Sequence, residues 1–85
     1  MTIQVRGFFH DAASTGAYEP FEIADGANVA EFLKEYYDHL PEDRRPERED
    51  FYKMTTVIVN GIARMRDAVI QNGDKVMLLR ALGGG

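Results

Sequence analysis

The sequence ends in a short apolar run that is followed almost at once by three glycines. Val76 to Leu79 is apolar throughout, and the turn signal Asn72-Gly73-Asp74 precedes it, so the run predicts a buried strand. Glycine loses more backbone freedom on ordering than any other residue, so Gly83 to Gly85 predicts a flexible tip. The fold must therefore bury this strand in a sheet. The six residues from Arg80 to Gly85 can reach about 20 Å when they are fully extended.

Four further segments carry strand patterns. Thr2 to Phe9 and Glu19 to Ala24 alternate apolar with polar residues, and Pro20 marks the second of them as an edge strand because proline cannot donate to a ladder. Thr55 to Val59 is β-branched throughout. The dipeptide Asn60-Gly61 follows it and predicts a tight hairpin with a return strand.

One amphipathic helix is predicted between the second and third of these strands. Asn28 is placed to cap it, and Glu31 three residues later completes a capping box. Pro41 disfavours continuation, so the helix should end near Leu40. The apolar residues with helical spacing are Val29, Phe32, Leu33, Tyr36 and Leu40.

The segment from Pro41 to Asp50 is rich in charge and contains two prolines. Charge runs of this kind predict a solvated connection, and a docking loop is the alternative. Three apolar residues directly after it, Phe51, Tyr52 and Met54, are expected to hold this loop against the body of the protein.

These elements predict an α+β protein in the order β-β-α-β-β-β, with one helix packed across a mixed sheet. Its 85 residues suffice for one core, and we expect a single domain over residues 1–82 followed by a glycine tail, residues 83–85. The net charge of −4 disfavours nucleic acid and anionic membranes as partners. Without cysteine there is no disulfide or cysteine-ligated zinc, which favours the cytoplasm, and no apolar stretch is long enough to cross a bilayer.

The side chains offer no recognisable catalytic constellation. His10 and His39 lack metal-ligand spacing, and no serine lies in a nucleophile motif. A terminal carboxylate remains, but it is a poor electrophile until a better leaving group is attached to it. A partner that holds ATP and magnesium could form an acyl-adenylate, stabilising the charge that develops. A sulfur donor would then give a thiocarboxylate, whereas a cysteine would pass the acyl group to an amine and give an isopeptide.

Segments along nearly the whole chain resemble the ubiquitin-like sulfur carriers, which include the small subunit of molybdopterin synthase and the thiamine sulfur carrier. The similar pieces are IQVRGFFHD, EIADGANVAEFL, VIVNG and NGDKVMLL, with the terminal glycine pair. The resemblance implies the β-grasp fold and a role for Gly84 and Gly85 in carrying sulfur as a thiocarboxylate for cofactor biosynthesis.

The resemblance also implies two partners, an adenylating enzyme of the ubiquitin-activating type and a sulfur-accepting synthase subunit. The chain itself is then expected to bind no cofactor and to be no enzyme on its own, since its partner uses the ATP and magnesium. The long loop favours a molybdopterin-type carrier over a thiamine-type one. Against that, Arg80-Ala81 stands where molybdopterin subunits usually have a proline pair, and Gly83 is an additional glycine.

Two other functions stay open at this point. The first is a protein modifier that is conjugated to lysines through Gly85, since the same adenylate leads to an isopeptide. The second is a β-grasp interaction domain whose tail is inert.

The last strand is expected to have one face toward the helix and one open face, because side chains alternate along a strand. An apolar patch on the open face, beside the tail, would mark a docking site. The expected core residues are Ile3, Val5, Val57, Val59, Val76 and Leu78, and the expected patch residues are Phe8, Ile58, Met77 and Leu79.

Three residues between the strand and the end of the chain complete the predicted partner-binding surface. Leu82 is expected to enter an apolar pocket of the partner, Arg80 to pair with an acidic group there, and Gly83 to belong to the same contact. The alternatives are a frayed end, and a patch that is covered by the loop around Phe51 and Tyr52.

Overall fold

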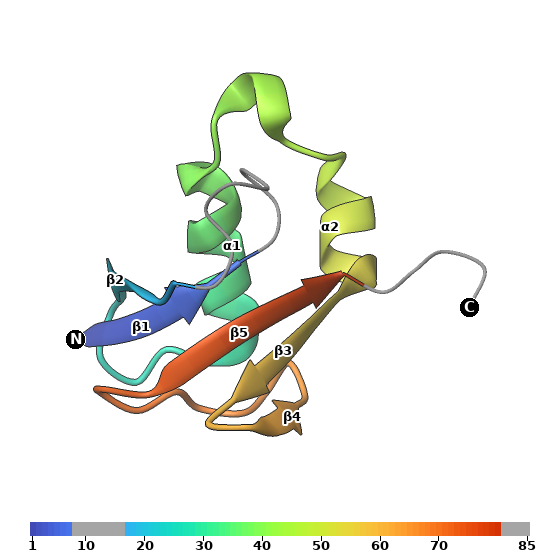
Figure 1. Ribbon diagram of the computed structural model, residues 1–85. Coiled ribbons are helices and arrows are strands. Elements are labelled where there is room, and N and C mark those ends of the chain that lie inside the picture. The colour runs from blue at the N-terminus through green and yellow to red at the C-terminus, as the bar shows by residue number, and fades with distance from the viewer. Residues whose placement is uncertain (8–16, 81–85) are drawn as a thin grey trace.

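A five-stranded mixed sheet forms the centre of the computed structural model, which describes residues 1–7 and 17–80 (Figure 1). The strand order is β2-β1-β5-β3-β4, with β1 and β5 parallel and the other neighbours antiparallel. The last of these strands in the sequence is therefore the central one, and the predicted edge position of Pro20 is confirmed. The strands are β1 Thr2–Arg6, β2 Glu19–Glu22, β3 Thr55–Val59, β4 Ile62–Arg64 and β5 Lys75–Arg80.

Helix α1, Val29–His39, lies behind the sheet in Figure 1 and begins at the predicted cap. The Glu31 amide donates to Asn28 Oδ1 at 2.9 Å, and the Asn28 amide donates to Glu31 Oε1 at 3.0 Å, so the capping box is confirmed. The helix ends before Leu40, as Pro41 requires. All five residues of the predicted stripe are buried.

The prediction of a loop over Pro41 to Asp50 was wrong in part. A 3-10 turn, η2, covers Glu42–Arg44, and a second helix, α2, covers Arg48–Met54. Two acids in the first turn of α2 and Lys53 in its last turn suit the helix dipole. Phe51 supplies the tertiary anchor, because it is 1% exposed and its ring centroid lies 5.2 Å from that of Tyr37. The predicted element order holds with α2 added before β3.

The hydrophobic core lies between the sheet and both helices. Its helical members come from both α1 and α2, so the two helices lie on the same face of the sheet (Figure 1). The predicted core residues Ile3, Val5, Val57, Val59, Val76 and Leu78 are all buried, which confirms the assigned side of each strand.

After β4 the chain crosses the N-terminus of α1. The amide of Val29 donates to Ala68 O at 2.9 Å and the amide of Ala30 donates to Arg66 O at 3.0 Å. Ile70, 1% exposed, fixes this crossing in the core. Together with Asn28, this segment satisfies the amides of the first turn of α1, which otherwise have no partner inside the helix.

The start of β5 is fixed by the turn that joins β3 to β4. Asn60 has a positive φ of 51°, as the predicted Asn60-Gly61 hairpin requires. Its amide donates to Lys75 O at 2.8 Å, and its side-chain oxygen accepts from the Lys75 amide at 3.0 Å. The two Asn-Gly turns of the sequence are thereby joined, because Asn60 Nδ2 also donates to Asp74 Oδ1 at 2.9 Å.

Candidate functional site

The face of the sheet opposite the helices carries three of the four apolar residues that were predicted there. Ile58 is the register partner of Met77, and Thr56 is that of Leu79, so β3 and β5 place these side chains in adjacent rows. All three apolar residues are partly buried, whereas Val76 and Leu78 beside them are 0% exposed. We call Ile58, Met77 and Leu79 the open-face strip. The structure brings these three residues together, and their role in binding a partner stays a prediction.

The alternative that Phe51 and Tyr52 cover this strip is not supported by their positions. Phe51 belongs to the core between the sheet and the helices. The Tyr52 ring centroid lies 6.2 Å from that of Tyr37, a residue of α1. Both aromatic residues therefore lie on the helix side of the sheet, where they hold α2 in place of the loop that the sequence predicted.

The chain leaves the sheet beside the junction of α2 and β3 (Figure 1). Strand β5 ends at Arg80, whose register partner is Thr55, the residue directly after α2. Thr55 is 3% exposed, so this junction is part of the packed body. Five of the predicted site residues lie outside the described residues, namely Phe8, Leu82, Gly83, Gly84 and Gly85.

Arg66 ties this junction together, and sequence reasoning did not find it. Its Nη2 donates to Thr55 O at 2.8 Å and also to the carbonyl oxygen of Tyr52 in the last turn of α2. A guanidinium at a helix C-terminus satisfies carbonyls that have no partner inside the helix and suits the negative end of the dipole. Arg66 thus fixes the position of the residue that pairs with the end of β5.

A basic hollow lies against the same junction. It has a volume of about 410 Å³, and its lining includes the cationic residues Lys53, Arg64 and Arg66. Met65 also lines it and is 77% exposed. A chain of net charge −4 therefore presents positive charge next to the point where it leaves the sheet.

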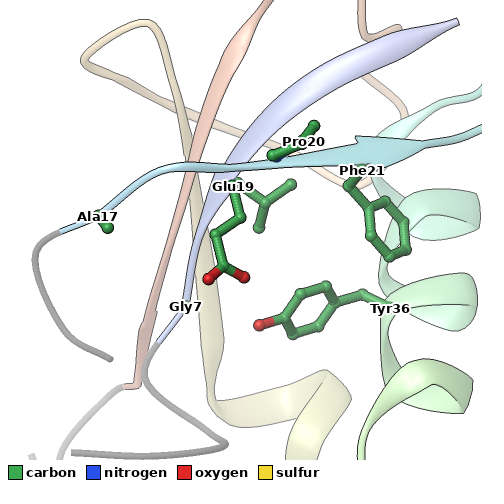
Figure 2. Close-up of a pocket in the computed structure, with 7 residues that line it drawn as sticks. Gly7, Ala17, Glu19, Pro20, Phe21 and Tyr36 are labelled. Atoms are coloured by element: carbon green, nitrogen blue, oxygen red, sulfur yellow. The ribbon is translucent and has the colours of Figure 1, made fainter. Parts of the chain in front are cut away.

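A second hollow lies on the other side of the core, between β2 and α1 (Figure 2). It holds about 50 Å³, and the Glu19 carboxylate and the Tyr36 hydroxyl point toward one another within it. Burial, and secondly the negative charge of Glu19, raise the pKa of Tyr36 to about 12. The hydroxyl therefore keeps its proton to a higher pH than an exposed tyrosine does.

Neither a metal centre nor a membrane span is found in the part of the chain that the structure describes. Residues 1–7 and 17–80 contain no group of three or more side chains that could hold a metal ion. His39 instead packs its ring edge-on against Phe21, at 5.1 Å between centroids. Neither described helix has the length and apolar character needed to cross a bilayer.

Comparison with known proteins adds a family and a fold. The model of the ThiS family matches residues 8–85. No curated protein matches the chain. The crystal structure of SAMP1 from Haloferax volcanii is similar with a TM-score of 0.66 and 16% identity, covering 100% of both chains.

A second solved structure also has a similar fold and a low sequence identity. It is a putative molybdopterin converting factor, subunit 1, from Pyrococcus furiosus, with a TM-score of 0.63 and 21% identity over 95% of this chain and 98% of that one. At such identities the likeness concerns the fold, and it confirms the expected α+β class with the ubiquitin-like β-grasp arrangement.

Proposed function

Because the chain belongs to the ThiS family of ubiquitin-like sulfur carriers, we propose that it carries sulfur as a thiocarboxylate on Gly85. Proteins of this family are small carriers that work with adenylating enzymes and synthase subunits and are not catalytic themselves. This chain would accordingly be a protein cosubstrate or the small subunit of a sulfur-transfer enzyme. The observation that carries the proposal is a family match that runs through β5 to Gly85.

The proposed chemistry needs two displacement steps on the terminal carboxyl group. A carboxylate oxygen of Gly85 attacks the α-phosphate of ATP on the partner, and pyrophosphate leaves with magnesium stabilising its charge. Sulfide, or a donor equivalent to it, then attacks the acyl carbon and displaces AMP. Glycine suits both steps because it lacks a Cβ, so the backbone of the partner can approach the reacting carbonyl closely.

The proposed partner surface combines the open-face strip with the end of β5. Apolar contact with Ile58, Met77 and Leu79 would supply binding energy, and Arg80, Leu82 and Gly83 would guide the chain toward the active site of the adenylating enzyme. The basic hollow at Lys53 and Arg64 favours an acidic rim on that enzyme, because complementary charge speeds encounter and fixes orientation. ATP and magnesium belong to the partner in this proposal.

For the pathway we propose molybdopterin-type sulfur transfer ahead of thiamine-type transfer. The support is the long segment between α1 and β3, which contains η2 and α2. Genes adjacent to that of this protein and growth of a deletion strain with and without each cofactor would identify the pathway.

An alanine added after Gly85 tests the proposed chemistry. It moves the carboxylate about 3.5 Å along an extended chain. A misplacement of about 1 Å between reacting groups can cost a hundredfold in rate. The extended protein should fold normally, since β5 ends at Arg80, and should accept no sulfur.

The measurement is the intact mass of each protein after incubation with its adenylating enzyme, ATP and sulfide, beside a melting curve of each. Sulfur replacing one terminal oxygen only in the natural chain supports the proposal. Sulfur on the untrimmed extended protein would overturn it, and ladders of larger conjugates in the native host would favour the protein modifier.

A further inference from the structure

The C-terminal half of α1 packs against the edge strand β2 through a set of aromatic contacts. Phe21 of β2 lies 5.8 Å from Phe32, 5.7 Å from Tyr36 and 5.1 Å from His39, measured between ring centroids. These three residues of α1 have helical spacing, so they form one ridge along the helix. Phe21 is only partly buried, so the contact between ridge and strand remains open to solvent on one side.

A groove of about 260 Å³ follows this contact, and we call it the β2–α1 groove. The smaller hollow of Figure 2 adjoins it, since Glu19, Pro20, Phe21 and Tyr36 line both. The combined site has aromatic walls and one carboxylate, and it lies away from the open-face strip, on the helix side of the sheet. Its lining is completed by His39, Leu40 and Pro41.

Glu19 contributes the one carboxylate among the described residues that line the β2–α1 groove. No lysine or arginine lines it, and within the described residues Glu19 forms no ion pair. Arg45 approaches one end of the groove, where its Nε donates to Leu40 O at 2.9 Å, and the acids Glu42 and Asp43 lie between Pro41 and Arg45 in the sequence. The faces of aromatic rings add electron density that attracts cations.

We propose that the β2–α1 groove binds an arginine side chain carried by an extended segment of a partner protein. A guanidinium is planar, so it can stack on the Phe21 and Tyr36 rings while its fork of N–H groups donates to the Glu19 carboxylate. Within the described residues no strand pairs with the outer edge of β2, and an unpaired strand edge of this kind can align an extended segment. The proposal does not depend on the chemistry of Gly85.

Two capped pentapeptides provide the probe, one with a central arginine between valines and one with citrulline in its place. Citrulline keeps the shape of arginine and removes its charge. Titrated into the isotopically labelled full chain, the arginine peptide should shift the backbone amide resonances of Glu19, Phe21 and His39. The citrulline peptide should bind roughly two- to fivefold more weakly, as expected for a partly exposed ion pair.

Two charge-removing variants localise the effect. Glu19→Gln should weaken the binding of the arginine peptide by the same factor. Glu49→Gln changes the net charge equally at an exposed position of α2, and it should leave the affinity for the arginine peptide unchanged. Equal binding of the two peptides, equal effects of the two variants, or shifts confined to Ile58 and Met77 would each overturn the proposal. So would amide shifts at the groove on concentrating the protein alone, since these would assign the groove to a second copy.

Discussion

Neighbouring residues of β5 lie in opposite environments. Val76 and Leu78 are 0% exposed and pack under the helices, whereas Met77 and Leu79 remain partly buried on the open face. β5 pairs with both β1 and β3, so hydrogen bonding within the sheet does not explain the difference in exposure between these residues. The difference comes from what covers each face of the strand. One face of β5 is thus available for recognition while the other holds the fold together, and single substitutions can separate the two.

The largest effect should come from Leu78→Ala compared with Leu79→Ala. Leu78 is 0% exposed, so truncation removes buried apolar contacts and leaves a cavity, which costs about 2–5 kcal/mol of unfolding free energy. Leu79→Ala should cost no more than about 1 kcal/mol, because its side chain already contacts solvent. Chemical denaturation of both variants measures the two values. Equal losses would mean that the open face is covered.

Arg66→Gln should have the next largest effect on stability, about 1.5–3 kcal/mol, the range for hydrogen bonds made by charged groups. The guanidinium bridges carbonyl oxygens of Tyr52 and Thr55, and a glutamine cannot reach both. Hydrogen exchange at Thr55 and Thr56 should speed up more than exchange at Val5. Arg66→Lys should restore only part of the protection, because lysine lacks the planar fork. Uniform acceleration across the sheet would show that Arg66 acts on the whole fold and not on the α2–β3 junction.

Leu79→Glu tests whether the open face of β5 contributes to partner binding. A charge in the open-face strip should weaken binding to the adenylating enzyme by about tenfold or more, the loss typical of an interface residue that contributes over 1 kcal/mol. The melting temperature should stay within a few degrees of the natural chain, since Leu79 is not part of the core. Val69→Glu is the matched control, because Val69 is 55% exposed and lies apart from the strip. Comparable losses for both variants would remove the strip from the interface.

The effect that is smallest at neutral pH, and that appears only above pH 10, concerns Tyr36 at the margin of the helix-covered face. Burial and the charge of Glu19 raise the pKa of Tyr36 from 10.0 to about 12. Between these values the unfolded chain releases the hydroxyl proton while the folded chain keeps it, so the stability contributed by Tyr36 is full below pH 10 and falls as pH rises toward 12. The difference in unfolding free energy between the natural chain and Tyr36→Phe should therefore shrink over this range. A difference that is constant with pH would contradict the raised pKa.

Residue alternation explains why so much of the sheet was predictable from the sequence. Side chains alternate between the two faces of a strand, so the sequence shows which side of β3 and β5 is buried. The apolar residues on that side then pack against the apolar stripe of the helix. The capping box at Asn28 is equally local, because both of its partners lie within three residues of each other. Signals of this kind need no knowledge of the tertiary fold.

Helix α2 was missed because its local signals conflict. Its segment combines dense charge with a preceding proline, which favours a loop, and only Phe51 is fully buried. The acids in its first turn and Lys53 in its last turn were the available clue. Tertiary packing of Phe51 on Tyr37 decided the outcome, and sequence spacing does not show that contact.

The Arg66 bridge and the β2–α1 groove depend on packing between distant segments. Arg66 binds main-chain carbonyls, which every residue carries, so no side-chain pattern marks its partners. Glu19 and Tyr36 come together only once α1 packs against β2, and their spacing in the sequence matches no motif. The predicted residues beyond Arg80 lie outside the described structure, so their roles stay predictions.

The position of β5 has a consequence for synthesis. The strand joins the β1–β2 hairpin to the β3–β4 hairpin, yet it follows both in the chain. A nascent chain still inside the ribosome at Lys75 therefore has two separate halves and no continuous sheet, and long-range pairing of this kind is slow to form. A message cut short before β5 encodes a chain that lacks the central strand of this sheet. Every folded copy has thus been translated at least to the end of β5, only five codons short of the glycine on which the proposed chemistry depends.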